Sequence, residues 1–301
     1  MSQGSWDQVA GVRSAPERYL SAEKGKLYFS PDLFMALQHP AVTDEQGLAV
    51  PLAAHRLMLY LDFTTALESL IVNPVLSSLG TGRLAVGLSG KERAAAWDIY
   101  VDEAYHARSA FRLAMQVAAA TGITHNFRES HGFQRVVDQH LGTGSVDPEV
   151  VRFASAVVSE TLISGTLELL PRDERVYSAI RQSVHDHEQD ERRHHAFFVA
   201  IFPGVWNQMT AKEREKIGPM LADFVRGFLE PDVASLRTVL TPVLGTTPLA
   251  DEILELVVYE PDLDTRIRRS ARATLNLFTK VGVLDVSPAR ERFEELCLTT
   301  N

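Results

Sequence analysis

The sequence predicts an all-α fold, and three observations support this prediction. Apolar residues recur at the three- and four-residue spacing of helices along four long stretches. No stretch shows a convincing two-residue alternation of the kind that marks β-strands. Glycines and prolines stand near the points where the helical spacing starts or stops. We therefore expect four long helices packed as a bundle, followed by additional helices.

The first two long helices are separated by a glycine-rich break. The first is expected from His55 to Ser78, with Pro74 near its end. The second is expected from Lys91 to Thr121, where Gly122 provides a helix-stop signal. The first stretch carries Glu68, and the second carries Glu103 and His106 on the same face as Ile99, Ala107 and Ala110.

The third and fourth long helices follow a loop rich in glycine. The third is expected from Glu149 to Leu169, with Ser164 on its apolar stripe. The fourth is expected to begin at Pro171, because a proline suits the first turn and acids at 173–174 complement a helix N-terminus. It is expected to end before Pro203.

The rest of the chain is expected to surround this bundle. We predict one domain over residues 1–301, with an irregular N-terminal arm at 1–54, the bundle at about 55–202 and a C-terminal helical cover at 203–301. Thr210-Ala-Lys-Glu213 has the pattern of a capping box within the cover. The prolines expected to separate its shorter helices are Pro219, Pro231, Pro242, Pro248 and Pro261.

A duplicated motif lies on two of the expected helices. Asp102-Glu103-x-x-His106 recurs as Asp190-Glu191-x-x-His194. Residues three apart share one helix face, so each copy offers a carboxylate and an imidazole together. The remaining two long helices each carry one isolated glutamate in an apolar stripe, Glu68 before the first copy and Glu160 before the second.

This combination predicts a site for two metal ions. Ferritin-like di-iron proteins are four-helix bundles in which two helices give one Glu each and two give Glu-x-x-His. Four carboxylates can neutralise two divalent cations, and imidazole is a suitable ligand for iron. The fold is thus predicted to be a ferritin-like bundle with additional C-terminal helices. The expected metal ligands are Glu68, Glu103, His106, Glu160, Glu191 and His194.

One further histidine lies on the face of the second motif. His187 precedes Glu191 by one helical turn, which makes it a candidate seventh ligand. The alternative is that His187 is not a ligand and belongs to a solvated polar helix face formed by the charge-rich residues 185–195. Neighbouring His185 and His195 point away from the face of the second motif and are expected to be surface residues or to contact the ligands.

The leading aspartates of the motif suit a supporting role. A carboxylate that accepts the free N–H of a ligand histidine fixes its tautomer, and we assign this role to Asp102 and Asp190. Arg192 and Arg193 fall off the ligand face and are expected to be surface charges. Tyr105 is expected to pack beside the site.

Composition narrows the functional classes. The 301 residues carry a net charge of −9, which argues against a nucleic-acid surface. Cys297 is the single cysteine, so disulfide frameworks and cysteine-based metal sites are excluded. The start Met-Ser-Gln-Gly-Ser-Trp has no signal-peptide pattern, and no run of about 18 apolar residues occurs. We expect a cytoplasmic protein that does not bind membranes.

The ligand pattern resembles that of the p-aminobenzoate N-oxygenase (AurF-type) family and the related arylamine oxygenase of chloramphenicol biosynthesis. The resemblance covers about residues 55–200. In this family, a histidine lies four residues before the second metal-binding glutamate, and His187 occupies that place. The resemblance therefore implies that His187 is a ligand and that both metals are iron.

The resemblance also implies an activity. Electrons from an external donor, such as a ferredoxin and its reductase, reduce the irons, which then bind O2, the co-substrate, and transfer oxygen to the nitrogen of an amine. The expected substrate is an arylamine, oxidised to a hydroxylamine, nitroso or nitro product in specialised-metabolite (antibiotic) biosynthesis. Each iron is expected to draw its Glu and His from one copy of the motif, with carboxylates bridging. We expect a homodimer.

Several alternatives stay open at this point. The same site can oxidise an aliphatic amine, a hydrazine or a C–H bond, and manganese can replace iron with the same ligands. Iron storage in the ferritin manner is the non-enzymatic alternative, although about 100 residues after the bundle are better explained by a substrate pocket. Arg266, Arg269 and Arg272 are candidate anchors for a substrate carboxylate, with a surface basic stripe as the favoured interpretation.

Overall fold

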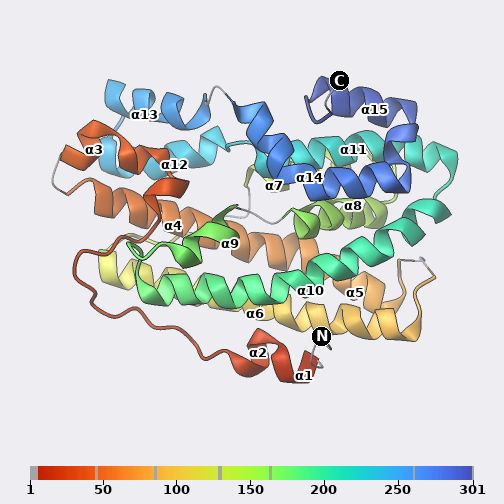
Figure 1. Cartoon of the computed structure of the whole chain (residues 1–301), viewed down its shortest axis with the longest axis horizontal. Coiled ribbons are helices and arrows are strands. Elements are labelled where there is room, and N and C mark those ends of the chain that lie inside the picture. The colour runs from red at the N-terminus through yellow and green to blue at the C-terminus, as the bar shows by residue number, and fades with distance from the viewer. Residues whose placement is uncertain are drawn as a thin grey trace.

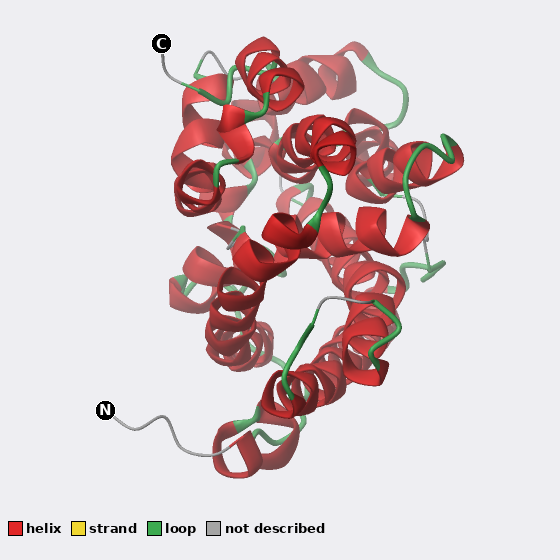
Figure 2. Cartoon of the chain, turned by 90° about the vertical axis from the view of Figure 1, so that its right-hand side faces the viewer, coloured by secondary structure: helices red, strands yellow, loops and turns green. Residues whose placement is uncertain are grey.

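The structure is a computed structural model of an all-α chain, which confirms the predicted fold class. It describes residues 6–44, 47–84, 87–127, 131–162, 165–259 and 262–299. Within this part of the chain no strand occurs, and the one β-type contact is an isolated bridge between Leu27 and Val176 (Figure 2). Ser164 and Pro261, both used in the sequence predictions, lie outside the described residues, as does the N-terminal stretch 1–5.

The first long helix is continuous but not uniform. It consists of α4 (Ala49–Ala66), a π-helical segment, η3 (Leu67–Val72), and α5 (Asn73–Thr81). It begins earlier and ends later than the predicted range 55–78. The second long helix, α6 (Gly90–Thr121), agrees with its prediction within one residue, and Gly122 ends it with a left-handed φ of 74°.

The third predicted helix, 149–169, is shorter in the structure. Helix α8 spans Pro148–Thr161, and Leu162 then takes an extended conformation. The hydroxyl of Thr274 donates to the carbonyl oxygen of Thr161 at 3.0 Å. A distant side chain therefore replaces the backbone N–H that would bond to this carbonyl if the helix continued. The short helix α9 (Gly165–Leu169) follows.

The predicted start of the fourth helix, at Pro171, is wrong. Pro171 lies in a 3-10 turn, η4 (Leu170–Arg172), and α10 spans Ser178–Gln208. The intervening chain makes a turn at 174–175, and a tertiary contact follows it, since Tyr177 donates its backbone N–H to the carbonyl of Leu27. The carboxylate of Glu23 then accepts the backbone N–H of Ser178 at 3.0 Å and caps the helix.

The predicted end of this helix, before Pro203, is also wrong, because α10 continues through the proline. A proline inside a helix removes one backbone hydrogen bond and costs about 3 kcal/mol. Phe202 and Trp206 lie on either side of Pro203 and are each 1% exposed, so their burial offsets this cost. In α11 and α12, Pro219 and Pro242 are likewise internal and do not separate helices.

The N-terminal arm and the C-terminal cover flank the long helices. In Figure 1 the C-terminal helices run along the top of the molecule, and α1 and α2 lie below α6. The arm contains α1 (Trp6–Val9), α2 (Gly11–Ser14), η1 (Pro31–Leu33), η2 (Met35–Gln38) and α3 (Pro40–Asp44). The remaining elements are α7 (Gly132–Gly142), α11 (Ala211–Leu229), α12 (Val233–Leu244), α13 (Pro248–Val258), α14 (Leu263–Val281), η5 (Val283–Asp285) and α15 (Ser287–Glu295).

The apolar core has two parts with polar residues between them. On α6, Ile99 belongs to one part and Ala110 to the other. On α10, Phe198 belongs to the first part and Val184 to the second. The residues between these positions include the duplicated motif. The arrangement of the long helices is compatible with a ferritin-like bundle, and it places the motif residues in the interior.

Close packing in the C-terminal cover gives a stability prediction. A Cβ atom added to Gly218 of α11 would lie 2.6 Å from the Cβ of Ala289 in α15. We expect Gly218→Ala to lower the free energy of unfolding by about 1–3 kcal/mol, because the two helices must separate. In the control Gly204→Ala on α10, the new Cβ meets nothing within 4 Å. Urea denaturation measures both, and equal stability of the two variants would contradict this packing.

Candidate metal centre

Seven side chains from four helical elements meet in the interior and form what we call the carboxylate–imidazole cluster. Its members are Glu68 of η3, Glu103 and His106 of α6, Glu160 of α8, and His187, Glu191 and His194 of α10. Glu103 and His194 are completely buried, and the most exposed side chains, those of His187 and Glu191, are 11% and 12% exposed. These are the seven residues that the sequence suggested as ligands.

A local distortion places Glu68 in the cluster. In the π-helical segment, the backbone N–H of Asn73 bonds to the carbonyl of Glu68, five residues earlier. Pro74 follows directly and has no N–H, so it cannot make the backbone hydrogen bond of a regular α-helix. The wider π-helical turn lies immediately before this break in the hydrogen-bond pattern. π-Helical turns occur frequently at functional sites. The predicted regular helix did not include this feature.

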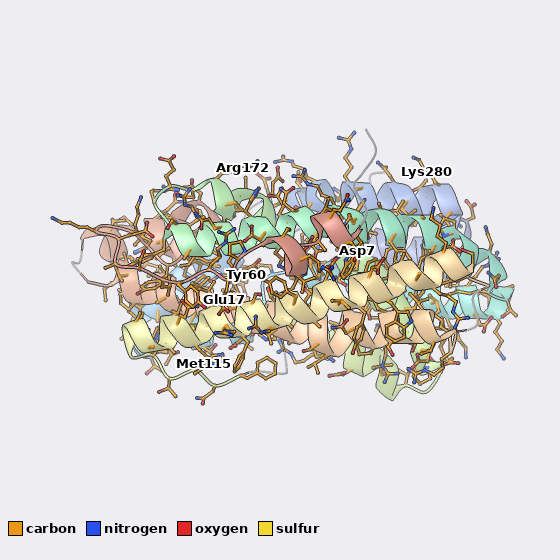
Figure 3. All side chains as sticks on the ribbon, turned by 90° about the horizontal axis from the view of Figure 1, so that it is seen from below. Asp7, Glu17, Tyr60, Met115, Arg172 and Lys280 are labelled. Carbon is orange, nitrogen blue, oxygen red and sulfur yellow. The ribbon has the colours of Figure 1, made fainter. Side chains whose placement is uncertain are left out.

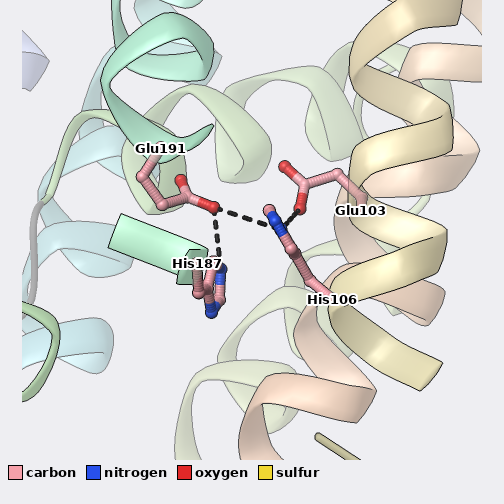
Figure 4. A group of neighbouring side chains, drawn as sticks. All are labelled: Glu103, His106, His187 and Glu191. Carbon is pink, nitrogen blue, oxygen red and sulfur yellow. Dashed lines mark hydrogen bonds and ion pairs between the residues drawn. The ribbon is translucent and has the colours of Figure 1, made fainter. Parts of the chain in front are cut away.

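The first set of possible ligand atoms joins α6 to α10. Ligand atoms of Glu103, His106, His187 and Glu191 all lie within 4.8 Å of one another. These side chains turn toward one another across the gap between the two helices (Figure 4). Nδ1 of His106 is 2.8 Å from Glu103 and 3.6 Å from Glu191. Nε2 of His187 is 2.8 Å from Glu191 and 3.6 Å from Glu68.

The second set of ligand atoms adds α8. Ligand atoms of Glu103, Glu160, Glu191 and His194 also lie within 4.8 Å of one another. Nδ1 of His194 is 2.8 Å from Glu103, 3.4 Å from Glu191 and 4.0 Å from Glu160. Glu103 and Glu191 therefore belong to both sets. Each set combines residues from both copies of the motif, unlike the expected assignment of one copy to each iron.

Unpartnered atoms in the cluster fit bound cations. Oε2 of Glu68 and Oε2 of Glu160 are buried without a hydrogen-bond partner, and Oε1 of Glu103 faces only Nδ1 of His194, at 2.8 Å. Buried polar atoms of this kind are costly unless they are paired or coordinate a metal. Carboxylate oxygens and neutral imidazole nitrogens suit iron, manganese or zinc. The donor set thus fits a pair of divalent ions.

The electrostatics of the cluster also favour cations. Burial and the neighbouring charges of Glu103, Glu191 and Glu160 raise the pKa of Glu68 well above its usual value. Burial and the charges of Glu191 and Glu103 do the same to the pKa of Glu160. Without cations, such carboxylates hold protons because their negative charges repel one another. Divalent ions can take the place of these protons.

The leading aspartates contact the histidines in a crossed arrangement. Asp190 lies 3.1 Å from Nε2 of His106, and Asp102 lies 3.2 Å from Nε2 of His194. Each aspartate therefore serves the histidine of the other copy of the motif. With Nε2 held as the donor, both histidines present Nδ1 to the cluster, whereas His187 presents Nε2.

Arg193 is a site residue that the sequence prediction missed. It was expected at the surface, but its guanidinium contacts both Asp190 and Asp102, the latter at 3.3 Å. Its side chain is 20% exposed, whereas the side chain of Arg192 is 61% exposed. The useful signal in the sequence was its position, three residues after Asp190 and therefore on the same side of the helix.

The sequence also named residues that are not members of the cluster, and their contacts and exposure are as follows. Tyr105 donates its hydroxyl to the carbonyl of Ala15 in the arm at 3.2 Å. His185 is exposed, and His195 is partly buried. The arginine candidates for a substrate anchor lie on α14, where Arg269 and Arg272 are exposed, as expected for a surface stripe.

A small cavity adjoins the imidazole side of the cluster. Its volume is about 50 Å³, and His106 and His187 form part of its wall. Tyr60 and Thr64 of α4 line it from a second side, and arm residues 16–18 from a third. A space of this size holds a few water molecules.

Comparison with known proteins identifies the family. The family model for the p-aminobenzoate N-oxygenase AurF matches residues 9–282. The chain belongs to this family. Members are di-iron oxygenases, so the chain is an enzyme of the oxygenase class. The match begins in the arm and extends through α14, well beyond the motif. No curated protein matches the chain.

Among the described residues, one segment, Pro148–Arg172, is long and apolar enough to cross a membrane. However, 73% of its apolar window is buried inside the protein, as in the core helix of a bundle. This segment contains α8 and therefore Glu160. It gives only weak support for a membrane span.

Proposed function

We propose that the chain is a non-haem di-iron N-oxygenase that uses O2 and external electrons to oxidise an amine, with an arylamine as the preferred class. The main support is the pair of overlapping ligand sets that share Glu103 and Glu191, in a member of an N-oxygenase family. Two carboxylates common to both sets can bridge two ions. We assign the seven cluster residues as the ligands.

Bound irons would relay the external electrons and provide the open coordination positions that O2 reduction needs. The chain's own residues have three tasks. Asp102 and Asp190 hold the histidine tautomers, and the apolar core on both sides excludes water from the centre. The cavity beside His106 and His187 is the proposed position of the amine nitrogen.

The electrons must come from outside the chain. One oxygen atom of O2 goes to the amine nitrogen and the other leaves as water, so external electrons and protons balance the step. A ferredoxin with its reductase, or a similar small redox system, is the proposed donor. A homodimer and a cytoplasmic location remain expectations from the sequence, as does a role in antibiotic biosynthesis.

Product analysis with labelled oxygen tests this function. The iron-loaded chain is supplied with a chemical reductant, ¹⁸O2 and a panel containing an arylamine, an aliphatic amine, a hydrazine and an amine-free aromatic. We expect ¹⁸O on the nitrogen of the arylamine as hydroxylamine, nitroso or nitro product, detected by mass spectrometry. Label only on carbon, or only on the aliphatic amine or hydrazine, would replace the proposal with one of its alternatives.

Two simpler measurements address the remaining alternatives. Size-exclusion chromatography separates a small oligomer from the large cage that iron storage requires. Metal analysis of protein purified without added metal salts distinguishes iron from manganese, which the same ligands accept. A large mineral-filled cage would overturn the enzymatic proposal.

A further inference from the structure

The N-terminal arm contacts the same two aspartates that bind the histidines of the cluster. Nε1 of Trp6 donates a hydrogen bond to Oδ1 of Asp102 at 3.0 Å. The backbone N–H of Gly11 donates to both carboxylate oxygens of Asp190, at 3.1 Å each. In Figure 3, viewed from below, α1 and α2 lie along the seam between α6 and α10. The arm therefore reaches the outer side of the centre.

Each aspartate is held from both sides. Oδ1 of Asp102 accepts from Trp6, while Oδ2 faces His194. Asp190 lies in the same way between Gly11 and His106. Both aspartates are at most 1% exposed, so water does not supply alternative donors. A buried carboxylate with donors on all sides has one orientation, and it passes that orientation to the imidazole it binds.

The close approach of the arm depends on a glycine. A Cβ added at position 11 would lie 2.6 Å from Oδ2 of Asp190, the oxygen that faces His106. Any larger residue must therefore push the carboxylate or move the arm. The φ angle of Gly11 is not in the left-handed region, so the backbone conformation does not require a glycine. The lack of space beside Asp190 is the reason that a glycine is needed here.

Further contacts fix the arm over the centre. The guanidinium of Arg18 donates to both oxygens of Asp186 at 2.8 and 3.0 Å. Tyr105, one residue before His106, holds the carbonyl of Ala15. Residues of the same segment line the cavity next to His106. When the arm is docked, it therefore both contacts the aspartates that hold the ligand histidines and forms part of the cavity wall.

We propose that Trp6 and Gly11 are positioning residues for the metal centre, an inference that rests on the proposed function. Trp6 orients His194 through Asp102, and Gly11 orients His106 through Asp190. Docking of the arm and binding of metal therefore strengthen each other. Because the two histidines lie in different ligand sets, each arm residue supports a different ion.

Cobalt(II) titration tests this assignment. Co²⁺ reports its ligands through visible absorption, and competition with a chelator gives its affinity. We expect Trp6→Phe to weaken one site and Gly11→Ala the other, each by about 10- to 100-fold with altered absorption bands, as is typical for losses around metal ligands. Trp97→Phe, at an indole 41% exposed on α6, and Gly204→Ala are the matched controls.

The reverse effect is measured on the unaltered chain. Arg13 lies within α2, and cleavage there requires the helix to open, so trypsin cleavage after Arg13 reports undocking of the arm. Coupling between two equilibria is reciprocal, so Co²⁺ should slow this cleavage by about the factor by which docking tightens Co²⁺ binding. This measurement does not depend on the folding of any variant.

The outcomes separate the two proposals. If the wild-type chain binds two Co²⁺ ions but the arm variants bind them like their controls and Co²⁺ leaves cleavage unchanged, only the positioning role is overturned. A wild-type chain that binds no Co²⁺ overturns the di-metal function and the positioning role together. Selective weakening of one site in each variant, with metal-dependent protection of the arm, supports the positioning role.

Discussion

Glu191→Gln is expected to remove both metal ions from the chain and to abolish oxygenation. The residue belongs to both ligand sets, so its loss affects two ions and not one. Its carboxylate also lies close to three histidines, at 2.8 Å from His187, 3.4 Å from His194 and 3.6 Å from His106. Changes around metal ligands cost about 10- to 100-fold in affinity, and a shared ligand should exceed the upper value.

The measurement is the number of irons per chain after reconstitution, together with product formation. Glu103→Gln should behave in the same way, since Glu103 is the other shared carboxylate. Glu188→Gln is the control, because it lies on the same helix with a side chain also 12% exposed and pairs with Arg192. A Glu191→Gln chain that retains two irons and full activity would show that the shared position has no bridging role.

Arg193→Met is expected to lower the free energy of unfolding of the metal-free protein by about 3–5 kcal/mol. The guanidinium lies between Asp102 and Asp190, which are fully and almost fully buried. The imidazole and arm contacts of the two aspartates remain in this variant, but the guanidinium charge is lost, and removing one partner of a buried ion pair is strongly destabilising. Met keeps most of the side-chain volume, so the change tests the charge rather than the packing.

Urea denaturation of the metal-free protein measures this effect. Arg192→Met is the control, because the Arg192 side chain is 61% exposed and its charge is solvated. Ion pairs of solvent-exposed side chains contribute about 0–1 kcal/mol. If the two variants lose the same stability, the arginine does not compensate the buried aspartates, and its contacts with them carry little energy.

The ligand residues could be found in the sequence because helical spacing is a local property. Glu103 and His106 share a face whenever the segment is helical, and the same holds for Glu191 and His194. The position of His187, one turn before Glu191, follows from the same geometry. The isolated glutamates were visible because charge is rare on an apolar stripe. The structure brings all of these residues together, although their binding of metal remains a proposal.

The helix limits were less predictable because distant residues decide several of them. Glu23 in the arm caps α10 at Ser178, and Thr274 of α14 bonds to the last turn of α8. Burial of the aromatic residues around Pro203 keeps α10 helical where local chemistry predicts a stop. Helix α7, in a region without a strong pattern, was not predicted.

The sequence by itself determined the helical class and the side chains that can serve as ligands, because both depend on residue type and on spacing within single helices. Only the tertiary structure decided how these side chains combine. The crossing of each aspartate to the other histidine, the placement of Arg193 between the aspartates and the contacts of Trp6 and Gly11 all join segments far apart in the chain. Such contacts depend on how helices pack, since periodicity within one helix carries no information about its partner's register.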